Sequence, residues 1–170
     1  MNRKNFIRSF GLAGIGVSVL PFSTQASVIQ EEVEPHLDRK LVEEFVSESH
    51  RNIEKVKELL EEHPNLINVA HDWRMGDFET GLGAASHVGY KKMVQFLLEN
   101  GAQANIFTAC LFGKIEIVKP MLEAFPSTLH AKGAHGFTLL HHANKGGDEA
   151  LEVKEYLIAL GAKETRVDLY

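Results

Sequence analysis

The stretch Thr80-Gly81-Leu82-Gly83-Ala84-Ala85-Ser86-His87-Val88-Gly89-Tyr90 decides the fold of this chain. Small residues such as Ala84 and Ala85 let a short helix pack closely against its neighbours. Two apolar pairs then follow at the spacing of one helix face, Met93-Val94 and Leu97-Leu98. Gly101-Ala102 comes after them, where a residue with positive φ can end the helix. The segment therefore predicts a short inner helix, a turn and an apolar-faced outer helix.

The same order of residues returns further along the chain. Near the C-terminus it reads Thr138-Leu139-Leu140-His141-His142-Ala143, then Gly147, Leu157-Ile158 and Gly161-Ala162. A shorter version reads Ala109-Cys110, Gly113, Ile117-Val118 and Met121-Leu122, and a first unit shows only its second half, Asn52 to Leu60. One such unit cannot bury its apolar face alone, so a stack of units is the smallest stable structure.

These units resemble the ankyrin repeat, whose pattern runs Thr-Pro-Leu-His, Ala-Ala, Gly-His, a Val, Leu-Leu and Gly-Ala. The resemblance is strongest from Ala84 to Asn105, although Gly81 and Leu139 stand where the family has proline. The third unit lacks its leading turn, because Gly89 and Gly113 are only 24 positions apart against about 33 in a standard repeat. The resemblance implies an all-α solenoid of stacked helix–turn–helix units over residues 40–170, with repeats at 40–78, 79–103, 104–134 and 135–170.

A longer duplication also runs through the chain. Leu59 to Pro64 matches Met121 to Pro126 at an offset of 62 residues. Each half then has a long loop in its middle, Val69 to Glu79 and Ala131 to Phe137. We therefore expect units one and two and units three and four to be two copies of a longer pair.

The N-terminus has the order of an export signal: basic Arg3, Lys4 and Arg8, a short apolar stretch, and the small-residue exit Thr24-Gln25-Ala26. We expect residues 1–26 to be a signal peptide and 27–39 a linker or N-terminal cap. Asn2 to Arg8 also resembles a twin-arginine signal, with Lys4 in place of the second arginine; ordinary secretion and a first buried helix are the alternatives. The expected location is periplasmic or otherwise extracytoplasmic.

Charge narrows the class of partner. The chain carries a net charge of −5, and removal of the three basic residues within 1–26 leaves −8. An acidic domain is a poor partner for nucleic acid or anionic membranes. We expect a soluble monomer without membrane insertion after signal removal, and without a disulfide, because Cys110 is the only cysteine.

The sequence indicates no catalytic residues, metal ligands or cofactor. His141 and His142 are adjacent, so on a helix they point about 100° apart and do not readily share one ion. In ankyrin repeats a histidine at the position of His141 bonds loop backbone, which implies a structural role. His71, Asp72 and Asp77 could suggest acid–base chemistry but have no nucleophile motif nearby. We therefore do not expect an enzyme.

The expected function is recognition of another protein, through the inter-helix loops and the concave groove. The first loop holds the only tryptophan, and Trp, Arg and Met are enriched at interface cores; the family resemblance adds groove-facing positions. The predicted partner-binding residues are Trp73, Arg74, Phe78, His87, Val88, Leu111, Phe112, Phe137 and Lys145. Two alternatives stay open: Trp73 and Phe78 cover the first inner helix, and Leu111 and Phe112 belong to the core. The alternative function is small-ligand binding or a metal-dependent activity in the groove.

The interpretation of residues 1–26 as an export signal can be tested directly. Intact-mass analysis of protein secreted by its native host should show an N-terminus at Ser27, because cleavage is expected after Ala26. Material that begins at Met1 or Asn2 would contradict the export interpretation. If the folded-protein route is used, replacing Arg3 and Lys4 together should block export, whereas ordinary secretion should tolerate a Lys-rich replacement.

Overall fold

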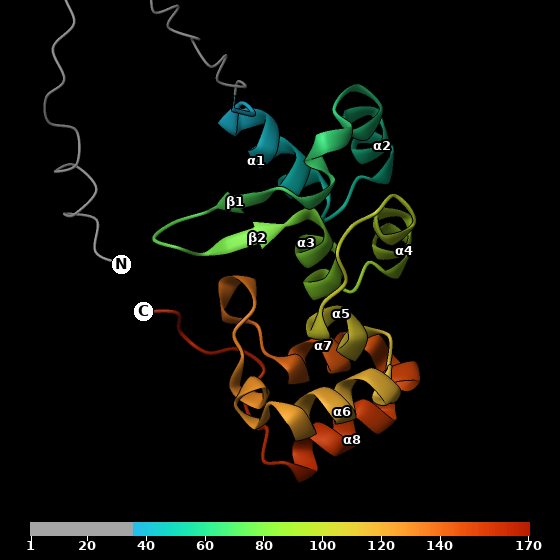
Figure 1. Ribbon diagram of the computed structural model, residues 1–170, viewed down its shortest axis with the longest axis vertical. Coiled ribbons are helices and arrows are strands. Elements are labelled where there is room, and N and C mark those ends of the chain that lie inside the picture. Colours follow the sequence, from blue (N-terminus) through green and yellow to red (C-terminus); the bar gives the residue numbers. More distant parts are fainter. Residues whose placement is uncertain (1–35) are drawn as a thin grey trace, which may run out of the picture. The chain divides into compact units, whose positions relative to one another are not determined.

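Four consecutive pairs of α-helices make up most of residues 36–170, the part of the chain that the computed structural model describes (Figure 1). The pairs are α1 (Arg39–Glu48) and α2 (Ile53–Glu62), α3 (Gly81–Val88) and α4 (Lys91–Glu99), α5 (Ile106–Leu111) and α6 (Ile115–Ala124), and α7 (Leu139–Gly146) and α8 (Leu151–Ala159). The prediction of a mostly helical chain is confirmed. The predicted signal peptide, 1–26, lies outside the described residues, as does most of the segment 27–39.

Short 3-10 helices and one small sheet fill the connections. They are η2 (Pro64–Asn68), the strands β1 (Ala70–Asp72) and β2 (Phe78–Thr80), η3 (Pro126–His130), η4 (Ala134–Gly136) and η5 (Gly147–Ala150). The antiparallel hairpin β1–β2 occupies the first long loop, where the sequence analysis expected no strand. The 62-residue offset is visible in the structure, since α2 with η2 and α6 with η3 begin at matching positions.

Side-chain caps set where several helices begin. Asn52, Thr80, Asn105 and Thr138 each accept a hydrogen bond from a backbone N–H in the first turn of the following helix. Gly89, with φ 82°, then ends α3 in the left-handed conformation. The helix boundaries are therefore fixed by local chemistry as well as by packing.

The first helices of the pairs contact one another in chain order, α1 with α3, α3 with α5, and α5 with α7 (Figure 1). Close approach requires glycine at two of these contacts. A Cβ on Gly81 would come within 2.7 Å of the Phe45 ring, and one on Gly146 within 2.4 Å of the Leu111 carbonyl oxygen. The small residues of the sequence pattern thus lie where the short helices meet.

The apolar core divides into two clusters. The first half of the described chain buries Phe45, Val56, Leu66, Met93 and Leu97, and the second half buries Cys110, Val118, Leu139, Val153 and Leu157. Within residues 36–170, no helix is long and apolar enough to cross a membrane.

Leu97 on α4 offers a test of this packing. Its side chain is fully buried, so Leu97→Ala should lower the free energy of unfolding by about 2–5 kcal/mol. The matched control is Ile158→Ala on α8, where half of the side chain is exposed and the loss should stay below about 1 kcal/mol. Denaturant unfolding of both variants measures the difference, and equal losses would contradict the assignment of Leu97 to the core.

Candidate functional site

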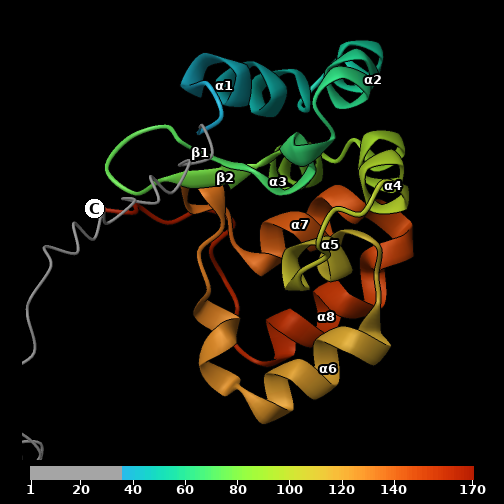
Figure 2. The same ribbon diagram turned by 45° about the horizontal axis from the view of Figure 1, so that its top comes forward.

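The β1–β2 hairpin has one buried and one exposed side. Its register pairs Ala70 with Thr80, His71 with Glu79 and Asp72 with Phe78. His71 and Glu79 are buried, whereas Phe78 is exposed, as expected for alternating side chains on a strand. The turn closes through a hydrogen bond from the Trp73 N–H to the Asp77 carbonyl, and Figure 2 shows it extending away from the helices.

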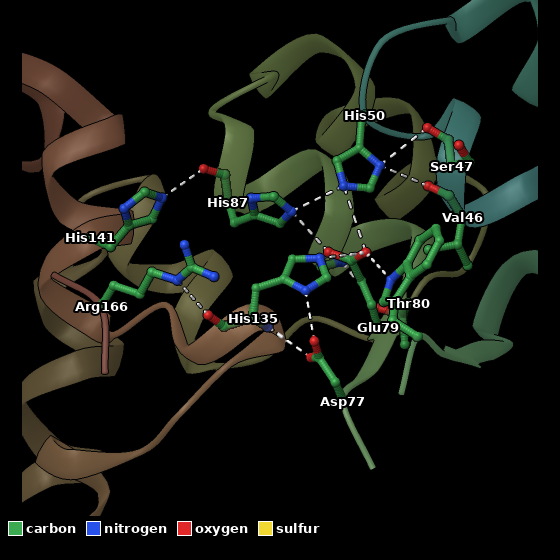
Figure 3. Close-up of polar contacts among 12 residues, drawn as sticks. Val46, Ser47, His50, Asp77, Glu79, Thr80, His87, His135, His141 and Arg166 are labelled. Atoms are coloured by element: carbon green, nitrogen blue, oxygen red, sulfur yellow. Dashed lines mark hydrogen bonds and ion pairs between the residues drawn. The ribbon is translucent and has the colours of Figure 1, made fainter. Parts of the chain in front are cut away.

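Four side chains converge beneath this hairpin, and we call them the histidine–glutamate cluster: His50, Glu79, His87 and His135. They come from the turn after α1, from β2, from α3 and from η4 (Figure 3). One potential ligand atom from each lies within 4.8 Å of all the others. Glu79 Oε1 is 2.8 Å from His87 Nε2, and Glu79 Oε2 is 3.6 Å from His50 Nε2 and 3.4 Å from His135 Nε2.

Outer partners orient three members of the cluster. His50 Nδ1 donates toward the backbone oxygens of Val46 and Ser47, each 3.1 Å away. His135 Nδ1 lies 2.8 Å from Asp77 Oδ2, and Trp73 Nε1 donates to Glu79 Oε2 over 2.7 Å. These contacts turn the Nε2 atoms of His50 and His135 toward the centre of the cluster (Figure 3).

Glu79 is a buried carboxylate with compensating partners. Burial raises the pKa of its carboxyl, but the contacts with His87, His50 and Trp73 outweigh burial, so the pKa lies below its usual range. Its side chain is fully buried, and Oε1 accepts no hydrogen bond of good geometry even though His87 Nε2 is near. The carboxylate is therefore charged and only partly satisfied.

The position of His135 depends on an unusual backbone. His135 has φ 56°, a conformation that side chains rarely adopt. Its N–H donates to Asp77 Oδ1 over 2.8 Å, and Arg166 Nε donates to its carbonyl oxygen over 2.8 Å. The next residue, Gly136, has φ 76°, and a Cβ there would lie 1.8 Å from the Val167 oxygen. The hairpin and the C-terminal segment together hold η4 in place.

The histidine pair of α7 is separate from the cluster. His141 Nε2 donates to the backbone oxygen of His87 over 2.8 Å, which is the structural role that the family resemblance implied. His142 is buried, and its Nδ1 donates to the Thr138 carbonyl oxygen over 2.8 Å. Burial lowers the pKa of His142 to about 4.

The structure distributes the predicted partner-binding residues over very different environments. Arg74, Phe78, Val88 and Lys145 are exposed, and Trp73, Phe112 and Phe137 are half-buried. The prediction that Leu111 binds a partner is wrong. Its side chain is fully buried in the first core cluster, because Gly146 lets α7 pack directly over it. His87 is also buried, within the histidine–glutamate cluster rather than free on a surface.

The sequence analysis did not predict this cluster. The sequence analysis named only His87, as a partner-binding residue, and the neighbouring Asp77, as a loop acid. No local spacing joins these positions, which come from four elements. The sequence feature that could have indicated the cluster is the pair of long loops at matching places in the two halves, because Glu79 and His135 lie within them.

Comparison with known proteins gives a short similarity. Serine/threonine-protein kinase TNNI3K of Mus musculus is 45% identical over 60 residues, and the Rattus norvegicus protein matches equally. The match covers 35% of this chain and 7% of the kinase. No family model matches the chain.

His142 predicts a dependence of stability on pH. Its pKa is about 4 in the folded protein against an ordinary value of 6.5. As the pH falls through this window the unfolded chain binds a proton that the folded chain does not, so stability is lost, by up to about 3 kcal/mol. Denaturant unfolding across this range should show a shallower loss for His142→Gln than for the wild type. Parallel curves would contradict the assignment.

Proposed function

We propose that this chain is an exported ankyrin-type repeat module that binds another protein on the side that carries the β1–β2 hairpin. In this proposal the four helix pairs are repeats of one solenoid. Two observations support it: the repeat-like residues lie at the contacts between successive pairs, and the similarity to TNNI3K extends over 60 residues, about the length of two repeats.

The observation that carries the proposal is the apolar tip of the hairpin. Met75 is 82% exposed and Phe78 is 62% exposed. The base beneath them is fixed, since Trp73 donates to the buried Glu79 and Asp77 is bonded to His135. A rigid element that presents exposed apolar side chains loses little conformational freedom on binding, which favours an interface.

A cavity beside Phe78 extends this surface. Its volume is about 350 Å³, and it is lined from β2, α3, α5 and the loop before η4, with Phe78, Gly83, Phe107 and Lys132 among the lining residues. Hot-spot side chains commonly enter such pockets between contact residues. We propose that the partner covers Phe78 and places a side chain in this cavity.

The structure changes the role that we assign to Trp73. Its ring packs against His71 and the first core cluster, and its Nε1 is already bonded. We therefore assign the principal contact to Phe78 and Met75, and treat Trp73 as the residue that fixes the hairpin base.

Two further elements of the proposal concern location and chemistry. Export to the periplasm or another extracytoplasmic space rests on the sequence of residues 1–26. We propose recognition rather than catalysis, and the state of the single cysteine supports this: Cys110 is buried, and burial raises the pKa of its thiol to about 12, so it is no thiolate nucleophile.

Substitution at the hairpin tip tests the interface. The protein with Met75→Ser and Phe78→Ala should bind its partner at least about thirtyfold more weakly, equivalent to about 2 kcal/mol, with an unchanged melting temperature. The partner is obtained by affinity capture from periplasmic extract, and its affinity for purified variants is measured by calorimetry.

Phe125→Ala is the matched control, because Phe125 has the same exposed fraction as Phe78, 62%, but follows α6. A captured protein counts as the partner only if the tip variant loses it and the control keeps it. Equal capture by both variants would refute binding at the hairpin.

A further inference from the structure

The histidine–glutamate cluster has too few protons for its hydrogen-bond acceptors. His50 Nδ1 faces two carbonyl oxygens and His135 Nδ1 faces the Asp77 carboxylate, so both protons lie on the outer nitrogens. The inward Nε2 atoms of these two rings are then lone pairs in the neutral state. His87 Nε2 is left as the one inward histidine donor, with His50 Nε2 at 3.1 Å and Glu79 Oε1 at 2.8 Å competing for it.

A buried group of lone pairs around a carboxylate requires a positive charge at its centre. Glu79 is 2% exposed and its Oε1 accepts no hydrogen bond of good geometry. An unsatisfied buried charge is strongly unfavourable. Either additional protons on the imidazoles or a metal cation would satisfy these atoms.

The distances favour a metal cation. Zinc bonds to nitrogen or oxygen are about 2.0–2.1 Å long, so the ligands of a tetrahedral ion lie about 3.3 Å apart. The shortest contacts in the cluster, which involve both carboxylate oxygens of Glu79, measure 2.8, 3.1, 3.4 and 3.6 Å and so scatter around this value. The remaining pairs of ligand atoms lie within 4.8 Å of one another, so movements of side chains would be enough to bring the four atoms to ligand positions.

The outer contacts also match those of metal sites. A ligating histidine usually donates its other ring N–H to a carboxylate or a backbone carbonyl, which fixes its tautomer and orientation. His135 does so to Asp77, and His50 to Val46 and Ser47. Trp73 fixes the Glu79 carboxylate in the same way.

The donor set indicates which ion fits. Three imidazole nitrogens and one carboxylate oxygen suit a borderline divalent ion, whereas magnesium and calcium prefer oxygen ligands alone. The charges of Glu79 and nearby Asp77 would balance a divalent ion. Access is open at the edge, because the side chains of His50 and His135 are 24% and 26% exposed.

We propose that His50, Glu79, His87 and His135 bind one divalent first-row transition metal ion, zinc fitting best, and that the ion joins the first and fourth helix pairs through the hairpin. This proposal replaces the expectation from sequence that the chain has no metal ligands. It does not depend on the binding of a protein partner.

Zinc titration of the chelator-treated full chain tests the site. Calorimetry should show one zinc ion per chain, and zinc should raise the melting temperature. Cobalt(II) added in place of zinc should give the visible absorption of a tetrahedral site. His87→Gln should weaken binding at least about a hundredfold, and Asp77→Asn, which keeps all four ligands, about 10–100-fold.

His130→Gln is the control, because His130 is exposed in η3 and outside the cluster; it should bind zinc like the wild type. Circular dichroism checks that each variant is folded, and Asp77→Asn decides the matter if His87→Gln does not fold. Zinc binding that is absent in the wild type, or that survives His87→Gln or Asp77→Asn unchanged, would overturn the proposal and leave protonated histidines as the partners of Glu79.

Discussion

The buried carboxylate of Glu79 is the constraint around which the central part of this structure is arranged. A charge removed from water needs several close polar partners, and the chain supplies them from four separate elements. No two of the contacting histidines come from the same helix or loop. The requirement to satisfy one carboxylate therefore fixes how α1, the hairpin, α3 and η4 approach one another, beyond what apolar packing specifies.

The same contacts connect the buried cluster with the exposed hairpin tip. Trp73 and Asp77 stand at the two ends of the turn, and each bonds to the cluster, Trp73 to Glu79 and Asp77 to His135. The turn between them carries Met75, which is exposed. An ion bound at the cluster would hold Glu79 and His135 more firmly, and through them both ends of the turn. The proposed metal site and the proposed interface thus differ in chemistry, but the hydrogen bonds of Trp73 and Asp77 connect them.

Much of the helical framework follows from sequence, and most of the site does not. Leu97 could be assigned to an outer helix because its neighbours repeat at helical spacing and Gly101 follows. The role of His141 came from its place in the repeat pattern and is met by its bond to the His87 carbonyl. The sequence left two assignments for Leu111, surface or core, because the sequence unit that contains it is shortened. The cluster could not be predicted from the sequence, because His135 reaches it only through a left-handed backbone conformation that no residue propensity predicts.

The short connection between α4 and α5 gives the geometry of the site a physical origin. The hairpin fills the connection between η2 and α3, whereas the connection from α4 to α5, Asn100 to Asn105, is short. Within the described chain no projecting loop therefore stands between the hairpin and the loop before α7. Direct contacts result. The hairpin meets η4 through Asp77 and His135, and the second helix pair meets the fourth through His87 with His141 and through Lys91 with the Gly146 carbonyl oxygen over 2.6 Å. A longer, projecting loop between α4 and α5 would place backbone in this space and separate His135 from Glu79. The short connection between α4 and α5 is thus what allows η4 to complete the cluster.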